Sequence, residues 1–285
     1  MMPFPAEKVD DRVNSFAALA NATIYDSEAT RHYVEGAPHL KHAALRELYG
    51  RLVLRAYDHV AANNHPVTVL DLGAGEGSAT RVLLELGAQV TAVDVSESQL
   101  QALQCACANY QGLEVCQAEA IDALQQFQAA GRRFDLVVAL SFLHHIPDYL
   151  EVIRNACALL TRRGTFFSFQ DPLKYDRLDP FVRSFGFVAY YSWRVLQGDV
   201  VGGAKRRLRR TRGIYLAQSP EDNVEYHVIR GGVDQQAIVA LFQSLDFQCE
   251  IVPYFSTQSR FWQALGSKLG LKNTFAVLAR ARSDS

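Results

Sequence analysis

The chain has 285 residues, 49% of them apolar, and a net charge of −1. This length suits one large α/β domain with additions, and the apolar content is enough for a sizeable core, which excludes a disordered or fibrous protein. A net charge near zero argues against a general nucleic-acid binder, whose phosphate contacts demand a basic excess.

Cysteine usage and hydropathy further limit the possible classes of protein. Five cysteines in so long a chain do not make a disulfide framework, and no histidine lies at metal-ligand spacing from Cys105 or Cys107, so we expect reduced thiols and no metal. No segment reaches the roughly 18 apolar residues that span a bilayer, and the acidic, proline-broken N-terminus is unlike a signal peptide. We therefore expect a cytoplasmic protein without a transmembrane segment, with a homodimer as one possible assembly.

Residues 1–65 are expected to form a helical cap over a ligand. Leu45, Leu48 and Leu52 recur at spacings of three and four, which predicts a helix over 40–62. The preceding residues 23–42 are richer in Tyr and His than a simple packing helix requires, although a helix and turn with ordinary polar surface explains them equally well.

The most informative motif is VTVLDLGAGEGSAT at 67–80. An apolar run ends near Asp71, Gly73, Gly75 and Gly77 follow, and 78–86 has a helical pattern, so strand, glycine turn and helix form a nucleotide-binding unit. Glycine favours the positive φ of a sharp turn, and amides at a helix start suit a methionine carboxylate. The spacing is GxGxG rather than the dinucleotide GxGxxG, and Asp71 would repel a pyrophosphate, which favours a sulfonium cofactor over NAD.

Three further apolar runs end in polar residues. Residues 88–96 end with Asp94, placed to accept from both ribose hydroxyls, and 113–120 end with Glu119 and a small Ala120, which suit an adenine amino group and ring. Residues 134–148 end with a loop that carries His144 and His145. Helical patterns at 99–110 and 150–160 follow the second and fourth runs, as in a parallel α/β sheet.

Residues 46–171 resemble the core of the class I S-adenosylmethionine-dependent methyltransferases. LHHIPD at 143–148, followed by LLTRRGTFFSF at 159–169, is similar to the subgroup that contains the ubiquinone and menaquinone biosynthesis methyltransferases and many small-molecule enzymes. The resemblance implies a Rossmann-like, doubly wound and mostly parallel seven-stranded sheet with a reversed last hairpin.

The resemblance also implies which residues bind S-adenosylmethionine. In such enzymes a tyrosine of the N-terminal region closes over the methionine end, and Tyr25 or Tyr33 matches it. Two departures are Glu119, where the family usually has Asp, and LTRRG, where a proline commonly precedes the glycine. The expected contacts are Asp71, Gly73, Ala74, Gly75 and Gly77 at the methionine end, Asp94 and Val95 at the ribose, Glu119 and Ala120 at the adenine, and Leu140 with the two tyrosines.

The remaining chain divides into an insertion and a completion of the sheet. After the core (66–171), residues 172–223 are expected to form a helical substrate lid, because Phe, Tyr and Trp crowd 181–193, although a hairpin packing its own small core fits as well. The only strong charge run, from Lys205 to Arg212, is a solvated face, a site for a phosphate or carboxylate, or a contact with a membrane surface or nucleic acid. Residues 224–285 should add helix 235–245, strand 248–254, a helix near 261–269 and strand 274–280.

Methyl transfer is an in-line displacement, so the protein mainly aligns the acceptor with the methyl carbon. An oxygen or carbon acceptor also needs a base, and His145 or His144 is placed for that role at the carboxyl edge of the sheet. A structural role for this pair is the alternative, and His32, His39 and His42 are the other candidates.

The loop SFLHH lacks the Asn/Asp-Pro-Pro-aromatic motif that resembling enzymes use on amide or adenine nitrogens. We therefore expect a small-molecule methyltransferase that methylates an oxygen atom of an aromatic, lipid-like or glycosylated metabolite, with S-adenosylhomocysteine as product. The alternatives are a C- or N-methyltransferase for a phosphate- or diphosphate-bearing molecule, a non-catalytic protein that binds the cofactor, and a nicotinamide-dependent reductase.

Overall fold

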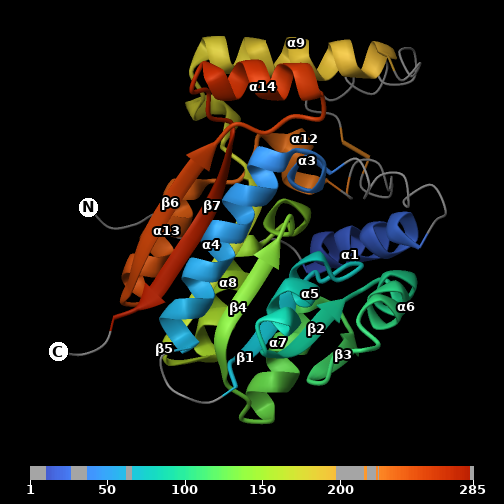
Figure 1. The fold of residues 1–285 in the computed structure, drawn as a ribbon, viewed down its shortest axis with the longest axis vertical. Coiled ribbons are helices and arrows are strands. Elements are labelled where there is room, and N and C mark those ends of the chain that lie inside the picture. Colours follow the sequence, from blue (N-terminus) through green and yellow to red (C-terminus); the bar gives the residue numbers. More distant parts are fainter. Residues whose placement is uncertain are drawn as a thin grey trace.

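The computed structural model describes residues 11–26, 37–61, 66–196, 215–216, 223 and 225–282. Its centre is a seven-stranded sheet in the order β3-β2-β1-β4-β5-β7-β6 (Figure 1). All neighbours pair in parallel except β7, which runs antiparallel to both β5 and β6. The predicted doubly wound sheet with a reversed last hairpin is confirmed. The strands are β1 (Thr68–Leu72), β2 (Gln89–Asp94), β3 (Leu113–Gln117), β4 (Phe134–Leu140), β5 (Leu160–Pro172), β6 (Phe247–Tyr254) and β7 (Thr274–Ala281).

Helices cover both faces of this sheet. The bounds are α4 (Ala43–Ala61), α5 (Ser78–Glu85), α6 (Glu97–Ala106), α7 (Ala120–Ala129), α8 (Tyr149–Ala158) and α13 (Gln235–Ser244). One buried cluster joins α4 and α5 to the sheet, and a second joins α7, α8 and α13 to its other face. Because both faces are covered, the central strands read as continuous apolar runs, which is why they were recognisable in the sequence.

One predicted helix is divided in the structure. The helix expected over 40–62 is split into α3 (Pro38–Lys41) and α4, because His42 between them has extended backbone and its ring Nε2 lies 2.8 Å from the carbonyl oxygen of Thr257.

The N-terminal helix α1 (Asp11–Tyr25) lies over the carboxyl ends of the first strands (Figure 1). Its last turn is tied to the start of α6: the Tyr25 carbonyl accepts from Ser98 Oγ at 3.2 Å and Gln99 Nε2 at 3.3 Å, and Asp26 Oδ1 accepts from Ser96 Oγ at 2.6 Å. Polar contacts rather than a large apolar core therefore hold this end of the cap closed.

The aromatic stretch of the insertion forms α9 (Pro180–Leu196), which packs on α14 (Arg260–Lys268) at one end of the molecule (Figure 1). The ring centroids of Phe185 and Trp262 are 5.1 Å apart, and Trp262 Nε1 donates to Ser192 Oγ at 2.6 Å. Short elements complete the described chain: the 3₁₀ turns η1 (Leu143–His145) and η2 (Tyr175–Arg177), and α12 (Tyr226–Arg230).

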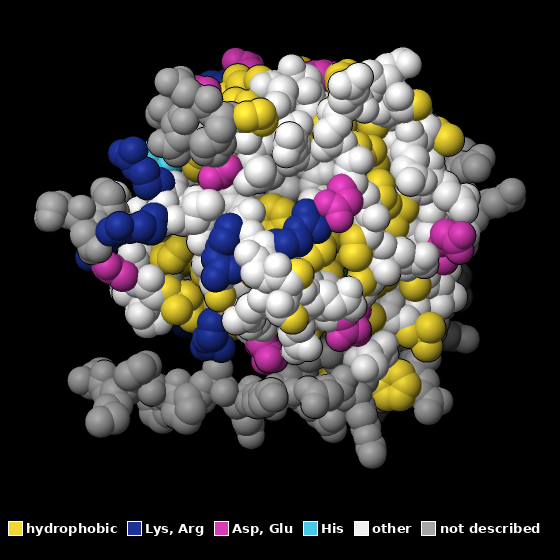
Figure 2. All heavy atoms as spheres, turned by 90° about the horizontal axis from the view of Figure 1, so that it is seen from below, with side chains coloured by type: hydrophobic (Ala, Val, Ile, Leu, Met, Phe, Trp, Pro, Cys, Tyr) yellow, Lys and Arg dark blue, Asp and Glu magenta, His cyan; other side chains and the backbone are white. Residues whose placement is uncertain are grey.

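The surface agrees with the near-neutral charge. On the face shown in Figure 2, the basic, acidic and apolar side chains of the described residues are interspersed. Within the described ranges, no helix combines the length and apolarity needed to cross a membrane.

Candidate functional site

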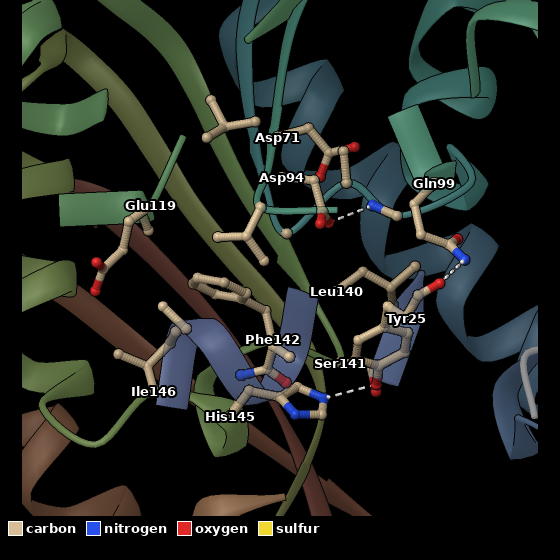
Figure 3. Close-up of a pocket in the computed structure, with 18 of the residues that line it drawn as sticks. Tyr25, Asp71, Asp94, Gln99, Glu119, Leu140, Ser141, Phe142, His145 and Ile146 are labelled. Atoms are coloured by element: carbon tan, nitrogen blue, oxygen red, sulfur yellow. Dashed lines mark hydrogen bonds between the residues drawn. The ribbon is translucent and has the colours of Figure 1, made fainter. Parts of the chain in front are cut away.

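A cavity of about 180 Å³ lies at the carboxyl ends of β1, β2 and β4, beneath α1 and α3 (Figure 3). The strand order reverses between β1 and β4, and ligands of open α/β sheets bind outside the carboxyl ends at such a point. Gly77 and His144 do not line the cavity, and Tyr33 lies outside the described residues. The predicted residues that line it are Tyr25, Asp71, Gly73, Ala74, Gly75, Asp94, Val95, Glu119, Ala120, Leu140 and His145.

The glycine turn is explained by backbone conformation and close packing. Gly73 has φ +69°, and a Cβ there would lie 2.2 Å from Cδ2 of Phe142. Gly77 has φ +91°, and a Cβ there would lie 2.9 Å from Cγ of Leu103. At both positions a side chain would have an unfavourable φ and would clash with a neighbouring side chain, so the turn needs glycine to keep its conformation.

The amides of this turn serve a different purpose from the one expected. Those of Gly73 and Ala74 donate to the Val93 carbonyl at 2.9 and 3.0 Å, and that of Gly77 donates to the Ala74 carbonyl at 2.9 Å. The Gly75 amide donates to Asp94 Oδ2 at 2.8 Å. These four donors are used within the protein, so the interpretation that they bind a methionine carboxylate does not match the geometry.

Asp94 lies at the end of β2 with its carboxylate at the cavity (Figure 3). Oδ2 accepts from Gly75, and Oδ1 accepts from the Ser96 amide at 2.9 Å. Burial raises the pKa of Asp94, and the backbone hydrogen bonds partly oppose that rise. Each carboxylate oxygen retains a second lone pair, so the group is oriented to accept from two neighbouring ligand hydroxyls.

Asp71 lies on β1 and is completely buried. Oδ2 accepts from Thr80 Oγ1 at 2.6 Å, whereas Oδ1 has no hydrogen-bond partner. Burial raises the pKa of this carboxyl to about 6 despite the hydrogen bond from Thr80. A buried carboxylate with one unsatisfied oxygen at a cavity is what a cationic ligand complements.

Glu119 and Ala120 line the far side of the cavity, after β3 (Figure 3). Burial, with Asp122 nearby, raises the pKa of Glu119, which precedes α7 without capping it through its side chain. Its carboxyl group is therefore available to a ligand, and the sequence analysis predicts that this ligand group is the adenine of the cofactor.

His145 and Tyr25 approach each other across the cavity. His145 Nε2 lies 3.4 Å from the Tyr25 hydroxyl, and the two rings meet edge-on with centroids 5.9 Å apart (Figure 3). Burial raises the pKa of Tyr25, with Glu225 and Asp94 adding to the rise, so the hydroxyl keeps its proton near neutral pH. The contact joins the cap to the loop after β4.

His144 points away from the cavity into the protein. Its Nδ1 lies 2.8 Å from Asp171 Oδ1, which also accepts from the His144 amide at 3.0 Å. The rings of His144 and His145 lie 4.1 Å apart. His144 therefore fixes the loop that carries His145, and Asp171 fixes His144.

The charges around the cavity are of one sign. Among its described lining residues there is no Lys or Arg, whereas Asp71, Glu76, Asp94, Glu119 and Asp148 all contribute carboxyl groups. This acidic lining favours a cationic or neutral ligand.

Two polar residues from the cap line the cavity without having been singled out for that position: Asn21, one helical turn before Tyr25, and His39, which was only an alternative base. Only its spacing from Tyr25 could have predicted that Asn21 lines the cavity, because residues four apart share a helix face. Asp171 was missed as well, although it too ends an apolar run. Of the other histidines, His42 pairs with Thr257 instead, and His32 lies outside the described residues.

The described aromatic residues of α9 do not line the cavity. Phe181 and Phe187 are exposed, and Phe185 packs on Trp262. The described aromatic packing is therefore with the C-terminal part of the chain, and the lid expected over 172–223 stays a prediction. The side chain of Trp193 and the basic run from Lys205 to Arg212 lie outside the described residues.

A family model described as "Methyltransferase domain" matches residues 70–166, the segment from β1 into β5 that supplies most of the cavity. Residues 70–166 therefore belong to a methyltransferase domain. The chain is 34% identical over 102 residues to a ubiquinone biosynthesis O-methyltransferase of Methylobacterium sp. (strain 4-46), and 37% identical over 102 residues to one of Stutzerimonas stutzeri (strain A1501). The alignments cover 36% and 35% of this chain, and only 40% and 43% of those relatives.

Solved structures resemble the fold of this chain over almost its whole length. The plantazolicin methyltransferase BpumL in complex with SAH has a TM-score of 0.54 at 12% identity, covering 95% of this chain and 97% of that one. The magnesium protoporphyrin IX methyltransferase of Synechocystis PCC 6803 with bound SAM has a TM-score of 0.50 at 15% identity, covering 97% and 100%. At such identities the likeness concerns the fold, and it extends to the elements outside residues 70–166.

Proposed function

We propose that this protein transfers a methyl group from S-adenosylmethionine to an oxygen of a small molecule. The observation that carries the proposal is the acidic cavity at the switch point of a methyltransferase domain, where the strand-end acids Asp71, Asp94 and Glu119 face one space. S-adenosylmethionine carries a sulfonium and an ammonium group, so these acids complement its charge.

The residues of the site fit this cofactor. Asp94 would accept from the ribose hydroxyls, since both its oxygens are already oriented by backbone amides. Glu119 and Ala120 would meet the adenine, and Asp71 with its unpartnered oxygen lies at the glycine turn. Gly73 and Phe142 are packed so closely that the floor of the site is already shaped.

When bound, S-adenosylmethionine would supply an activated methyl group, and the remaining tasks fall to side chains. His145 is the proposed base that takes the acceptor's proton, because it lines the cavity and its Nε2 faces the Tyr25 hydroxyl at 3.4 Å. An acceptor hydroxyl would share or replace that contact. Tyr25 and α1 would exclude water, and His144 and Asp171 would position the base.

The residues that line the cavity also indicate which kind of methyl acceptor fits. Without Lys or Arg among its described residues, the cavity favours an uncharged acceptor over a phosphate or diphosphate. Two relatives are named ubiquinone biosynthesis O-methyltransferases, which supports an oxygen atom on an aromatic or lipid-like molecule. The phosphate alternative predicts that neutralising Arg206, Arg207, Arg209 and Arg210 raises the acceptor's KM strongly; we expect an unchanged KM.

The first test is calorimetric titration of the full chain with S-adenosylhomocysteine, with NADH in a parallel titration. Micromolar binding of S-adenosylhomocysteine alone supports the proposal, and binding of NADH alone, or of neither, overturns it. Release of S-adenosylhomocysteine from S-adenosylmethionine in the presence of phenolic and quinol acceptors then separates an enzyme from a non-catalytic binder. A cytoplasmic location and a homodimer stay predictions, to be checked by fractionation and light scattering.

A further inference from the structure

We propose that His227 is a positioning residue, which holds the loop after β4 so that His145 faces the cavity. The inference rests on the proposed function, because His227 would act through the proposed base. His227 lies on α12, outside the residues 70–166 that the family model matches, and no motif in the sequence identifies it.

The ring of His227 contacts the loop directly. Its Nε2 lies 3.0 Å from the carbonyl oxygen of Ile146 and 3.1 Å from that of Pro147. Carbonyl oxygens only accept hydrogen bonds, so Nε2 carries the hydrogen and donates it to both. Ile146 and Pro147 follow His145 in the chain and line the same cavity, so these contacts act on the wall of the site.

The His227 ring is itself held in one state. Burial lowers its pKa to about 4, and the two hydrogen bonds partly oppose that fall, so the ring is neutral near pH 7. Tyr149 meets it edge-on with ring centroids 4.9 Å apart, and the Tyr149 hydroxyl accepts from the Asp234 amide at 3.1 Å. Both the tautomer and the orientation of the ring are therefore fixed.

The helix that carries His227 is anchored to the end of β5. The Val233 amide donates to the Pro172 carbonyl at 2.9 Å, just after α12 ends. Asp234, the next residue, forms a salt bridge in which Lys174 Nζ lies 2.9 Å from Oδ2. Since α12 also packs against η1, His227 holds the loop from a fixed part of the fold.

The loop is thus held on both sides of His145. Asp171 fixes the residue before it, through contacts of 2.8 and 3.0 Å, and His227 fixes the carbonyl groups of the two residues after it. His145 itself points across the cavity toward Tyr25 (Figure 3). A general base must lie within hydrogen-bond reach of the proton that it takes, so holding the loop at both ends serves catalysis.

The first experiment needs no acceptor. In the full chain labelled with ¹⁵N-histidine, nuclear magnetic resonance should show the His227 ring with its hydrogen on Nε2 near pH 7; the other tautomer would overturn the proposal. His227→Leu removes the donor and should move the ring signals of His145, whereas His227→Gln, whose amide can donate, should move them less. Unmoved His145 signals in His227→Leu would overturn the proposal as well.

The second experiment asks whether His227 acts through His145. With the phenolic or quinol acceptor that gives the fastest turnover, His227→Leu should lower kcat about tenfold, roughly the effect of losing two hydrogen bonds, and His227→Gln should restore most of the loss. Affinity for S-adenosylhomocysteine should change less than kcat. In the His145→Ala background, His227→Leu should cause no further loss of kcat, because the residue on which it acts is already gone.

The matched control is His59→Leu, the same change at an exposed histidine that does not line the cavity, and it should leave kcat and the His145 signals unchanged. An equal tenfold loss of kcat with and without His145 would mean that His227 only supports the fold, which overturns the positioning role while the base assignment stands. Retained kcat in His145→Ala alone would instead overturn the base, and the positioning role with it.

Discussion

The Gly75 amide donates a 2.8 Å hydrogen bond to Asp94 Oδ2, joining the turn after β1 to the end of β2. The Ser96 amide holds the other oxygen of the same carboxylate at 2.9 Å. One side chain therefore fixes the glycine turn and presents a negative charge to the cavity, so its removal should affect the shape of the site as well as the affinity for ligand.

We expect Asp94→Ala to weaken S-adenosylhomocysteine binding by about 1.5 to 3 kcal/mol, through loss of charge-assisted hydrogen bonds to the ribose. Titration calorimetry measures the effect. Glu97→Ala is the control, because it removes the same charge from an exposed position three residues away. Unchanged affinity in Asp94→Ala would refute the ribose assignment.

Gly73→Ala should destabilise the fold more than Gly87→Ala. Both glycines have positive φ, +69° and +83°, so alanine at either costs about 1 to 2 kcal/mol in backbone strain. At Gly87 a Cβ has open space, whereas at Gly73 it would overlap Phe142 at 2.2 Å. Denaturant unfolding should show the larger loss for Gly73→Ala, and equal losses would mean that Phe142 moves aside freely.

The core of the fold was predictable because both faces of its sheet are covered. Strands such as β1 and β4 are then continuous apolar runs, and the residues that follow them meet at one edge. For that reason the positions of Asp71, Asp94 and Glu119 at one cavity followed from the order of the motifs.

The cap was not predictable in the same way. The position of Asn21 and His39 depends on how α1 and α3 close over the sheet, and no local pattern encodes that docking. The hydrogen bonds of the glycine turn were not predictable either. The sequence shows which residues have a backbone amide, but it does not show that the Gly75 amide donates to Asp94, 19 residues further along the chain.

His145→Ala should lower kcat by at least about 100-fold, the usual range for a general base, with little change in cofactor affinity. Tyr25→Phe removes the hydroxyl that lies 3.4 Å from His145 Nε2 but keeps the ring over the cavity, so we expect a smaller loss of kcat and a shifted pH–rate profile. Steady-state kinetics against pH measures both effects.

The control for the base is His59→Ala, which removes an exposed imidazole that does not line the cavity. Asp171→Asn tests positioning: it weakens the 2.8 Å contact with His144 and should lower kcat without altering binding of S-adenosylhomocysteine. Retained kcat in His145→Ala would leave His145 as scaffolding only.

Asp71 should make stability depend on pH. Burial raises its pKa from 3.8 to about 6, so between these values the folded protein binds more protons than the unfolded chain. The free energy of unfolding contributed by Asp71 therefore falls as pH rises from about 4 to about 6 and is constant above that. A shift of this size corresponds to a penalty on the order of 3 kcal/mol at pH 7.

Asp71→Asn keeps an oxygen for Thr80 and removes the ionisation, so the variant should be more stable than the wild type at pH 7.5 and lose that advantage toward pH 4. Its affinity for S-adenosylhomocysteine should fall, because the ligand's ammonium loses a buried negative charge. Denaturant unfolding at several pH values, with calorimetry at pH 7.5, measures both. A stability difference that does not change between pH 4 and 6 would show that Asp71 ionises with its ordinary pKa, which would contradict the raised pKa that its burial causes.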